Sequence, residues 1–158
     1  MAQRIYLLVS AVLMAIVSQS RLVRFVTRDY VTYDLTCWTL SEGTTGEIVS
    51  NAPWALMVLA IGLSLLSLFT LFLVFYQNYA LQKRMTIYNM LVTVGFMLTY
   101  AAFFFYYRGH LDVLLCDVTW WAVAVPVVTL ILQFMAFLAI RKKEAAVLFD
   151  ASSFRLRD

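Results

Sequence analysis

The chain has 158 residues, a net charge of +3, 63% hydrophobic and only 13% charged residues, and a mean hydropathy of +0.83. A water-soluble domain of this size has no core large enough for so much apolar surface, whereas a lipid bilayer surrounds such surface with lipid. The composition therefore excludes an ordinary soluble protein. It predicts a single membrane domain over residues 1–158, with no nucleic acid among its partners.

Four stretches free of Asp, Glu, Lys and Arg predict four transmembrane helices, since a spanning helix needs ~20 mostly apolar residues. We place these helices at about residues 4–27, 53–76, 85–107 and 118–143. A cytoplasmic tail over residues 144–158 follows the last of them. The predicted fold class is an all-α membrane protein, an antiparallel bundle of four transmembrane helices.

The first apolar stretch is short, which leaves two interpretations open. It is either a secretory signal peptide with Arg4 before its apolar run, or a retained helix that continues past Arg21 and Arg24. We favour the retained helix, because long arginine side chains reach the headgroup region from a buried stem. Arg21, Arg24 and Arg28 are spaced so that they would share one face of that helix.

The segment between the first two helices predicts a small extracytoplasmic β-hairpin at about residues 30–50. Its first half is rich in β-branched and aromatic residues with partial alternation, and residues 41–46 form a turn cluster. An isolated hairpin is only marginally stable in water, so we expect it to lean on the loop at 108–119 or on a partner.

Lysine and arginine placement predicts the orientation, because cytoplasmic loops carry an excess of these residues. With four helices, eight basic residues share one side and four share the other. The eight are Arg4, Lys83, Arg84, Arg141, Lys142, Lys143, Arg155 and Arg157, and the four are Arg21, Arg24, Arg28 and Arg108. Both termini are therefore expected in the cytoplasm, with Arg141, Lys142 and Lys143 near anionic lipid headgroups.

Several residues within the helices have predicted structural roles. Ala60, Gly62 and Ser64 form a small-residue pattern that favours close helix packing, and Pro126 is expected to kink the last helix. The tryptophans expected to anchor the outer interface are Trp54, Trp120 and Trp121. The polar residues expected inside the membrane are Asn89, Thr93 and Gln133.

Several segments together resemble one known family. They are the opening residues 1–5, the inner loop at 76–84, the stretch 121–126 that ends on Pro126, and residues 139–145 at the start of the tail. The chain resembles the four-helix membrane proteins of Bacteroidota grouped as domain of unknown function 4293. It departs from them at Lys143, where the family has Asp, and near residues 152–157, where an Asp is missing. The resemblance implies a bacterial inner membrane protein and carries no established activity.

The two cysteines suggest a redox hypothesis. In the predicted topology Cys37 and Cys116 both lie outside the cytoplasm, where disulfides persist, so they are candidates for a bridge between the hairpin and the loop between the third and fourth helices. Two free, buried thiols are the alternative. A thiol redox enzyme is disfavoured, because such enzymes rely on a Cys-x-x-Cys pair that this chain lacks.

Other chemistry has little support in the sequence. His110 is the only histidine, and with Asp112 and Asp117 it would make a weak metal site, so a solvated loop histidine is the better interpretation. No ionisable residue falls in the middle of a predicted helix. We therefore expect no catalytic residues, no metal and no cofactor.

The sequence favours a non-enzymatic inner-membrane subunit or accessory protein that packs against and stabilises a larger membrane complex. Its expected partners are membrane lipid and other membrane protein subunits. A small transport or lipid-handling protein is the first alternative, and it predicts a solvent-accessible cavity lined by Asn89, Thr93 and Gln133. A thiol redox protein that uses Cys37 and Cys116 is the second.

Overall fold

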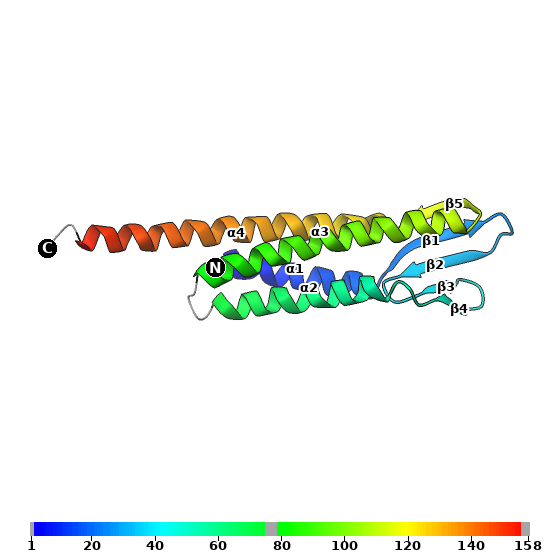
Figure 1. The fold of residues 1–158 in the computed structure, drawn as a ribbon, viewed down its shortest axis with the longest axis horizontal. Coiled ribbons are helices and arrows are strands. Elements are labelled where there is room, and N and C mark those ends of the chain that lie inside the picture. The colour runs from blue at the N-terminus through cyan, green and yellow to red at the C-terminus, as the bar shows by residue number, and fades with distance from the viewer. Residues whose placement is uncertain (1, 75–78, 156–158) are drawn as a thin grey trace.

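The computed structural model describes residues 2–74 and 79–155. Four helices pack side by side, and a five-stranded sheet lies at one end of them (Figure 1). The helices are α1 (Ala2–Ser18), α2 (Trp54–Leu73), α3 (Tyr79–His110) and α4 (Trp120–Arg155). The strands are β1 (Arg21–Thr27), β2 (Thr32–Thr36), β3 (Leu40–Glu42), β4 (Ile48–Ser50) and β5 (Val113–Val118).

The predicted all-α fold class is wrong, because the five strands form one antiparallel sheet in the order β4-β3-β2-β1-β5. The hairpin expected at residues 30–50 accounts only for β2, β3 and β4. Two further strands come from segments predicted as helix and loop, at 21–27 and 113–118. The sheet is therefore assembled from both connections on its side of the helices.

Three helices, α2, α3 and α4, are long and apolar enough to cross a membrane, which identifies a membrane protein. The expected first transmembrane helix at 4–27 is wrong in length, since α1 ends at Ser18 and has 17 residues. At 1.5 Å per residue it is about 25 Å long, less than the ~30 Å of a hydrocarbon core. The fourth helix is instead longer than predicted, because α4 continues to Arg155 through most of the expected tail.

The helices form a closed ring of neighbours. α1 contacts α2 and α4, and α3 contacts the same two helices, so α1 and α3 lie diagonally opposite each other. Figure 1 shows that α4 projects beyond the other helices at the end away from the sheet. Both chain termini lie toward that end.

The predicted arginine stripe on a helix is also wrong, because Arg21 and Arg24 belong to β1. The stretch from 21 to 27 contains two valines, a phenylalanine and a threonine, which suit a half-buried strand better than a helix. Nε and an NH2 group of Arg24 donate to the two carboxylate oxygens of Asp34 on β2, at 2.7 and 2.9 Å. Arg21 lies 3.8 Å from the same carboxylate. The guanidinium groups therefore hold two strands together.

The inner face of the sheet extends the helical core. Phe25 and Leu35 are fully buried there, and the Phe25 ring lies 6.0 Å from that of Phe104 on α3. The hydroxyl of Tyr107 donates to Oγ of Ser50 at 3.3 Å, which joins α3 to β4. The C-terminal end of α3 therefore packs under the sheet, and the sheet and helices share one apolar core.

The ion pair at Asp34 predicts acid sensitivity. The hydrogen bonds from Arg24 hold the Asp34 carboxyl pKa below its ordinary value. A depressed pKa contributes stability that is complete above the ordinary carboxyl pKa of about 4 and is lost as the pH falls through the depressed value. We expect the thermal unfolding temperature of the purified protein to fall as the pH is lowered below about 4, as followed by near-ultraviolet circular dichroism.

Asp34→Asn should lower the unfolding temperature at neutral pH and flatten this acid dependence. Asp29→Asn is the matched control, since Asp29 is exposed and has no ion pair among the described residues. An equal effect from both variants would contradict the role given to Asp34.

Candidate functional site

The interior of the helices follows one spacing. The residues that each helix buries recur alternately three and four positions apart, the repeat of a left-handed coiled coil. On α3 they are Gln82, Thr86, Asn89, Thr93 and Phe96, and on α4 Ala122, Pro126, Thr129, Gln133, Ala136 and Ile140. On α1 they include Gln3, Leu7, Ser10, Met14 and Val17, and on α2 Leu56, Ala60, Leu63, Ser67 and Thr70. The four helices therefore enclose a common seam.

This seam changes character along its length. Near the sheet it is lined by apolar side chains such as Met14, Leu63 and Phe96, which join the sheet core. Toward the other end it becomes polar. We call the buried polar set there the polar core; it consists of Gln3, Ser10, Ser67, Thr70, Gln82, Thr86, Asn89, Thr93, Thr129 and Gln133, all at most 1% exposed.

A pair of glutamines closes the end of the polar core. Nε2 of Gln3 on α1 donates to Oε1 of Gln82 on α3 at 2.9 Å, across the diagonal of the helix ring. Nε2 of Gln82 donates in turn to the carbonyl of Leu73 at 3.0 Å, near the end of α2. This chain of two hydrogen bonds joins three helices at the end opposite the sheet.

Asn89 is the centre of the next group. Its Nδ2 donates to Oγ1 of Thr70 at 3.1 Å, and its Oδ1 accepts a long bond of 3.5 Å from Ser67. Ser10 on α1 lies 3.5 Å from Ser67 and also donates to the carbonyl of Leu7 at 2.8 Å. One amide on α3 thus bonds both polar residues that α2 contributes.

Thr93 links α3 to α4. Its Oγ1 lies 2.9 Å from Oε1 of Gln133 and 2.8 Å from the carbonyl of Asn89, but a hydroxyl has only one hydrogen to donate. If the Gln133 side-chain amide is rotated by a half turn, its NH2 group donates to Oγ1 of Thr93. The Thr93 hydroxyl can then donate to the main-chain carbonyl of Asn89. Both bonds are then satisfied, so we take this as the arrangement of the pair.

The three intramembrane polar residues predicted from sequence are therefore connected, with Gln133 on α4 bonding Thr93 and Thr93 bonding the Asn89 carbonyl. Each side chain is 0% exposed, so none borders a space that water can enter. The accessible cavity that a transporter would need is absent at these residues. Sequence reasoning missed Gln3, Gln82 and the buried serines and threonines, although the spacing of residues 82, 86, 89 and 93 is a visible signal.

The chemistry of the polar core is limited. Its members are amides and hydroxyls, and the buried residues of the described chain include no Asp, Glu, Lys, Arg or His. Such groups hydrogen-bond across helices but offer no titratable site for a proton relay at neutral pH. Interhelical bonds of this kind contribute on average ~0.6 kcal/mol each, with a maximum near 1.7.

The predicted packing residues have mixed outcomes. Ala60 is buried, and Oγ of Ser64 lies 3.1 Å from the carbonyl of Ala60 and 3.4 Å from that of Ala11, so Ser64 lies where α2 meets α1. Gly62 is exposed, and a Cβ added there would meet nothing within 4 Å. Pro126 lies inside α4, which continues past it, and lines a cavity of about 240 Å³ against α3.

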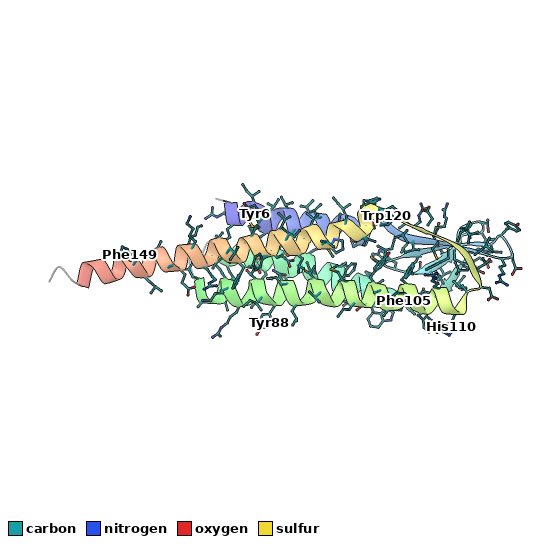
Figure 2. All side chains as sticks on the ribbon, turned by 90° about the horizontal axis from the view of Figure 1, so that it is seen from above. Tyr6, Tyr88, Phe105, His110, Trp120 and Phe149 are labelled. Atoms are coloured by element: carbon teal, nitrogen blue, oxygen red, sulfur yellow. The ribbon has the colours of Figure 1, made fainter. Side chains whose placement is uncertain are left out.

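The predicted interface residues lie at the two ends of the helices. Trp54, Trp120 and Trp121 are exposed at the starts of α2 and α4, and Figure 2 shows Trp120 at the boundary between helices and sheet. Arg141, Lys142 and Lys143 are exposed on α4 toward the opposite end. The tryptophans and the basic residues therefore lie at opposite ends of the apolar part of the helices.

The expected Cys37–Cys116 disulfide is contradicted, because both thiols are free. Cys116 on β5 lies opposite Phe25 on β1, which lies opposite Tyr33 on β2, so β1 separates the strand of Cys116 from the strand that precedes Cys37 by two strand spacings, about 9.6 Å. Cys37 is a further four residues along the chain from Tyr33. A disulfide needs Cα atoms within about 7 Å, so no bridge can form without rearranging the sheet.

His110 has a structural environment of its own. Its ring stacks on Tyr106 with centroids 4.2 Å apart, and its Nδ1 lies 2.9 Å from the Tyr106 carbonyl. Within residues 2–74 and 79–155, no group of three His, Cys, Asp or Glu side chains lies close enough together to hold a metal ion.

The comparison with family models gives one match, a domain of unknown function (DUF4293), over residues 2–148. The chain belongs to this family. The match covers α1, α2, α3, all five strands and α4 as far as residue 148, and it confirms the resemblance seen in the sequence. Neither the comparison with curated proteins nor that with solved structures gave a match. The description of this family names no activity.

Thr93 and Gln133 allow a direct test of the polar core. We expect Thr93→Val and Gln133→Leu each to lower the free energy of unfolding, with a coupling of ~0.6–1.7 kcal/mol between them in a double-mutant cycle. Unfolding in detergent or bicelles provides the measurement. Leu98→Ala, a change on the exposed face of α3, is the control. A coupling indistinguishable from zero would show that the pair does not bond.

The cysteines predict a distinct labelling pattern. Burial raises the pKa of the Cys37 thiol to about 12, so at pH 8 this thiol is almost entirely protonated and unreactive. We expect a maleimide to modify the partly exposed Cys116 in the native protein and Cys37 only after unfolding. Mass spectrometry without reductant should count two thiols. Finding no free thiol would show that the two cysteines form a disulfide after all.

Proposed function

We propose that this protein is a non-enzymatic inner-membrane subunit that packs against and stabilises a larger membrane complex. The observation that carries the proposal is the closed interior. Most of its polar side chains hydrogen-bond within the protein, although Oε1 of Gln3 and Oγ1 of Thr129 have no partner there, and the described residues bury no charged group. Such an interior offers no path for a transported molecule and no reactive group for catalysis. We therefore place the function of this protein on its surface.

The surface that best fits a protein partner is the free edge of β5. It is the outermost strand on one side of the sheet, and its six residues make it twice as long as β4 on the other side. Leu114 and Leu115 are 57% and 64% exposed on it. A free strand edge presents unpaired backbone N–H and C=O groups, which pair readily with another strand.

The geometry argues that this partner is a different protein. The strands run roughly along the length of the helices (Figure 1). Antiparallel pairing of β5 with β5 of a second copy would therefore place the second copy upside down in the membrane. Two copies inserted in the same direction cannot pair in this way, whereas an extended segment of another subunit can.

The proposed orientation places both termini in the cytoplasm of a bacterial cell and the sheet outside. The charge distribution supports it. Of the four basic residues assigned to the outer side, Arg21 and Arg24 lie against Asp34 and are partly neutralised. At the opposite end, Arg84, Arg141, Lys142 and Lys143 are exposed. The net positive charge is thus concentrated at the end proposed to be cytoplasmic.

The test is gentle solubilisation of native membranes, followed by native electrophoresis and identification of the chains that migrate with this protein. We expect a defined complex that is depleted when the protein is deleted. Leu115→Lys should release the protein from it, because a charge on a strand edge blocks further pairing. Ile48→Lys on β4 is the matched control, since Ile48 is 62% exposed on the other edge of the sheet.

Migration of the wild-type protein as a monomer, with every larger complex unchanged by its deletion, would overturn the proposal. Equal release by Leu115→Lys and Ile48→Lys would keep the complex but reject the β5 edge as its contact.

A further inference from the structure

An apolar groove runs between α3 and α4 on the outer surface of the helices. Its volume is about 340 Å³, and no polar atom contributes to its exposed lining. The residues that line it are Ile87, Met90, Leu91 and Val94 from α3, and Phe134 and Phe137 from α4. A groove of this kind in a membrane protein faces lipid acyl chains rather than water.

Two arginines lie at one end of this groove. Arg84 precedes Ile87 by three residues and Leu91 by seven, so it lies on the same face of α3. Arg141 follows Phe137 by four residues and Phe134 by seven, which places it on the groove face of α4. Because the helices are antiparallel neighbours, both guanidinium groups lie at the same end.

The positive charges of these two arginines are available to bind an anion. Both side chains are exposed, and neither has an ion pair or hydrogen bond among the described residues. The nearest acid by sequence on α4, Glu144, is already bound by Nζ of Lys83 at 2.8 and 3.1 Å. This ion pair also shows that α3 and α4 are in contact at the level of the arginines.

We propose that the groove binds an anionic phospholipid, with Arg84 and Arg141 holding its phosphate and the apolar lining holding an acyl chain. Guanidinium groups match phosphate oxygens in charge and shape. The dimensions agree: from Arg84 to Val94 is ten residues, about 15 Å along the helix, which is half of a ~30 Å hydrocarbon core. The groove therefore spans one leaflet from headgroup to midplane.

The site is distinct from a general attraction of lipid to basic residues. Lys142 and Lys143 are the next two residues of α4, and successive residues on a helix are rotated by about 100°. Their side chains therefore point away from the groove face that Arg141 occupies. They carry the same charge at the same depth without the apolar lining, which makes them a matched control. The inference does not depend on the proposed protein partner.

The experiment is native mass spectrometry of the full-length protein in mild detergent, titrated with phosphatidylglycerol or phosphatidylcholine. We expect phosphatidylglycerol to bind with a single tight site. Arg84→Gln with Arg141→Gln should weaken it about 30-fold, since each basic residue near an anionic headgroup contributes on the order of fivefold. Lys142→Gln with Lys143→Gln should change it less than about threefold.

Two further measurements distinguish the contribution of the lipid headgroup from that of the acyl chain. Val94→Trp should fill the groove and weaken binding with every charge retained, and inorganic phosphate should not displace the lipid. The proposal is overturned if phosphatidylcholine binds as tightly as phosphatidylglycerol, if the lysine variant loses as much affinity as the arginine variant, or if inorganic phosphate displaces the lipid.

Discussion

The structure depends on a constraint that lipid imposes: a polar group inside the membrane has no water to bond and must find its partner within the protein. The NH2 group of Gln3 and the Gln82 amide meet this requirement across the diagonal of the helix ring, and Asn89 meets it through Thr70, whereas Oε1 of Gln3 has no partner. Because these bonds need particular helix rotations, they fix how the helices face one another. The outward faces are left to apolar side chains, and one of those faces carries the groove between α3 and α4.

The sheet follows from the same arrangement. α3 is 32 residues long, so its outer end extends beyond the length that a hydrocarbon core needs and carries aromatic side chains into the region of the headgroups and beyond. Phe104 meets Phe25 there, and Tyr107 bonds Ser50. An isolated hairpin would be marginal, but strands that pack on a fixed helix end share its core. The β5 edge is exposed because β5 is the last strand of the sheet and pairs only with β1.

The sequence was sufficient to locate the four apolar helices, because hydropathy is a local property, but only α2 lies close to its predicted limits, since α1 is shorter and α3 and α4 are longer than expected. It misled at Arg21–Thr27, where the arginine spacing matched a helix face although β-branched and aromatic residues favoured a strand. The pairing of that segment with residues 113–118 joins positions about ninety residues apart, and no local pattern reveals it. Asn89, Thr93 and Gln133 were recognised as polar, but their partners on other helices depend on the packing.

Water access to the polar core tests the account most directly, since a protein that acts through its surface needs no hydrated interior. The measurement is reaction of a charged methanethiosulfonate reagent with Thr93→Cys and Gln133→Cys in membranes, each in a Cys116→Ser background, with Leu114→Cys as the exposed reference. The account predicts rapid modification at position 114 and none at 93 or 133 until the protein is unfolded. Modification of both interior positions in the native protein would show a water-filled path and contradict the account.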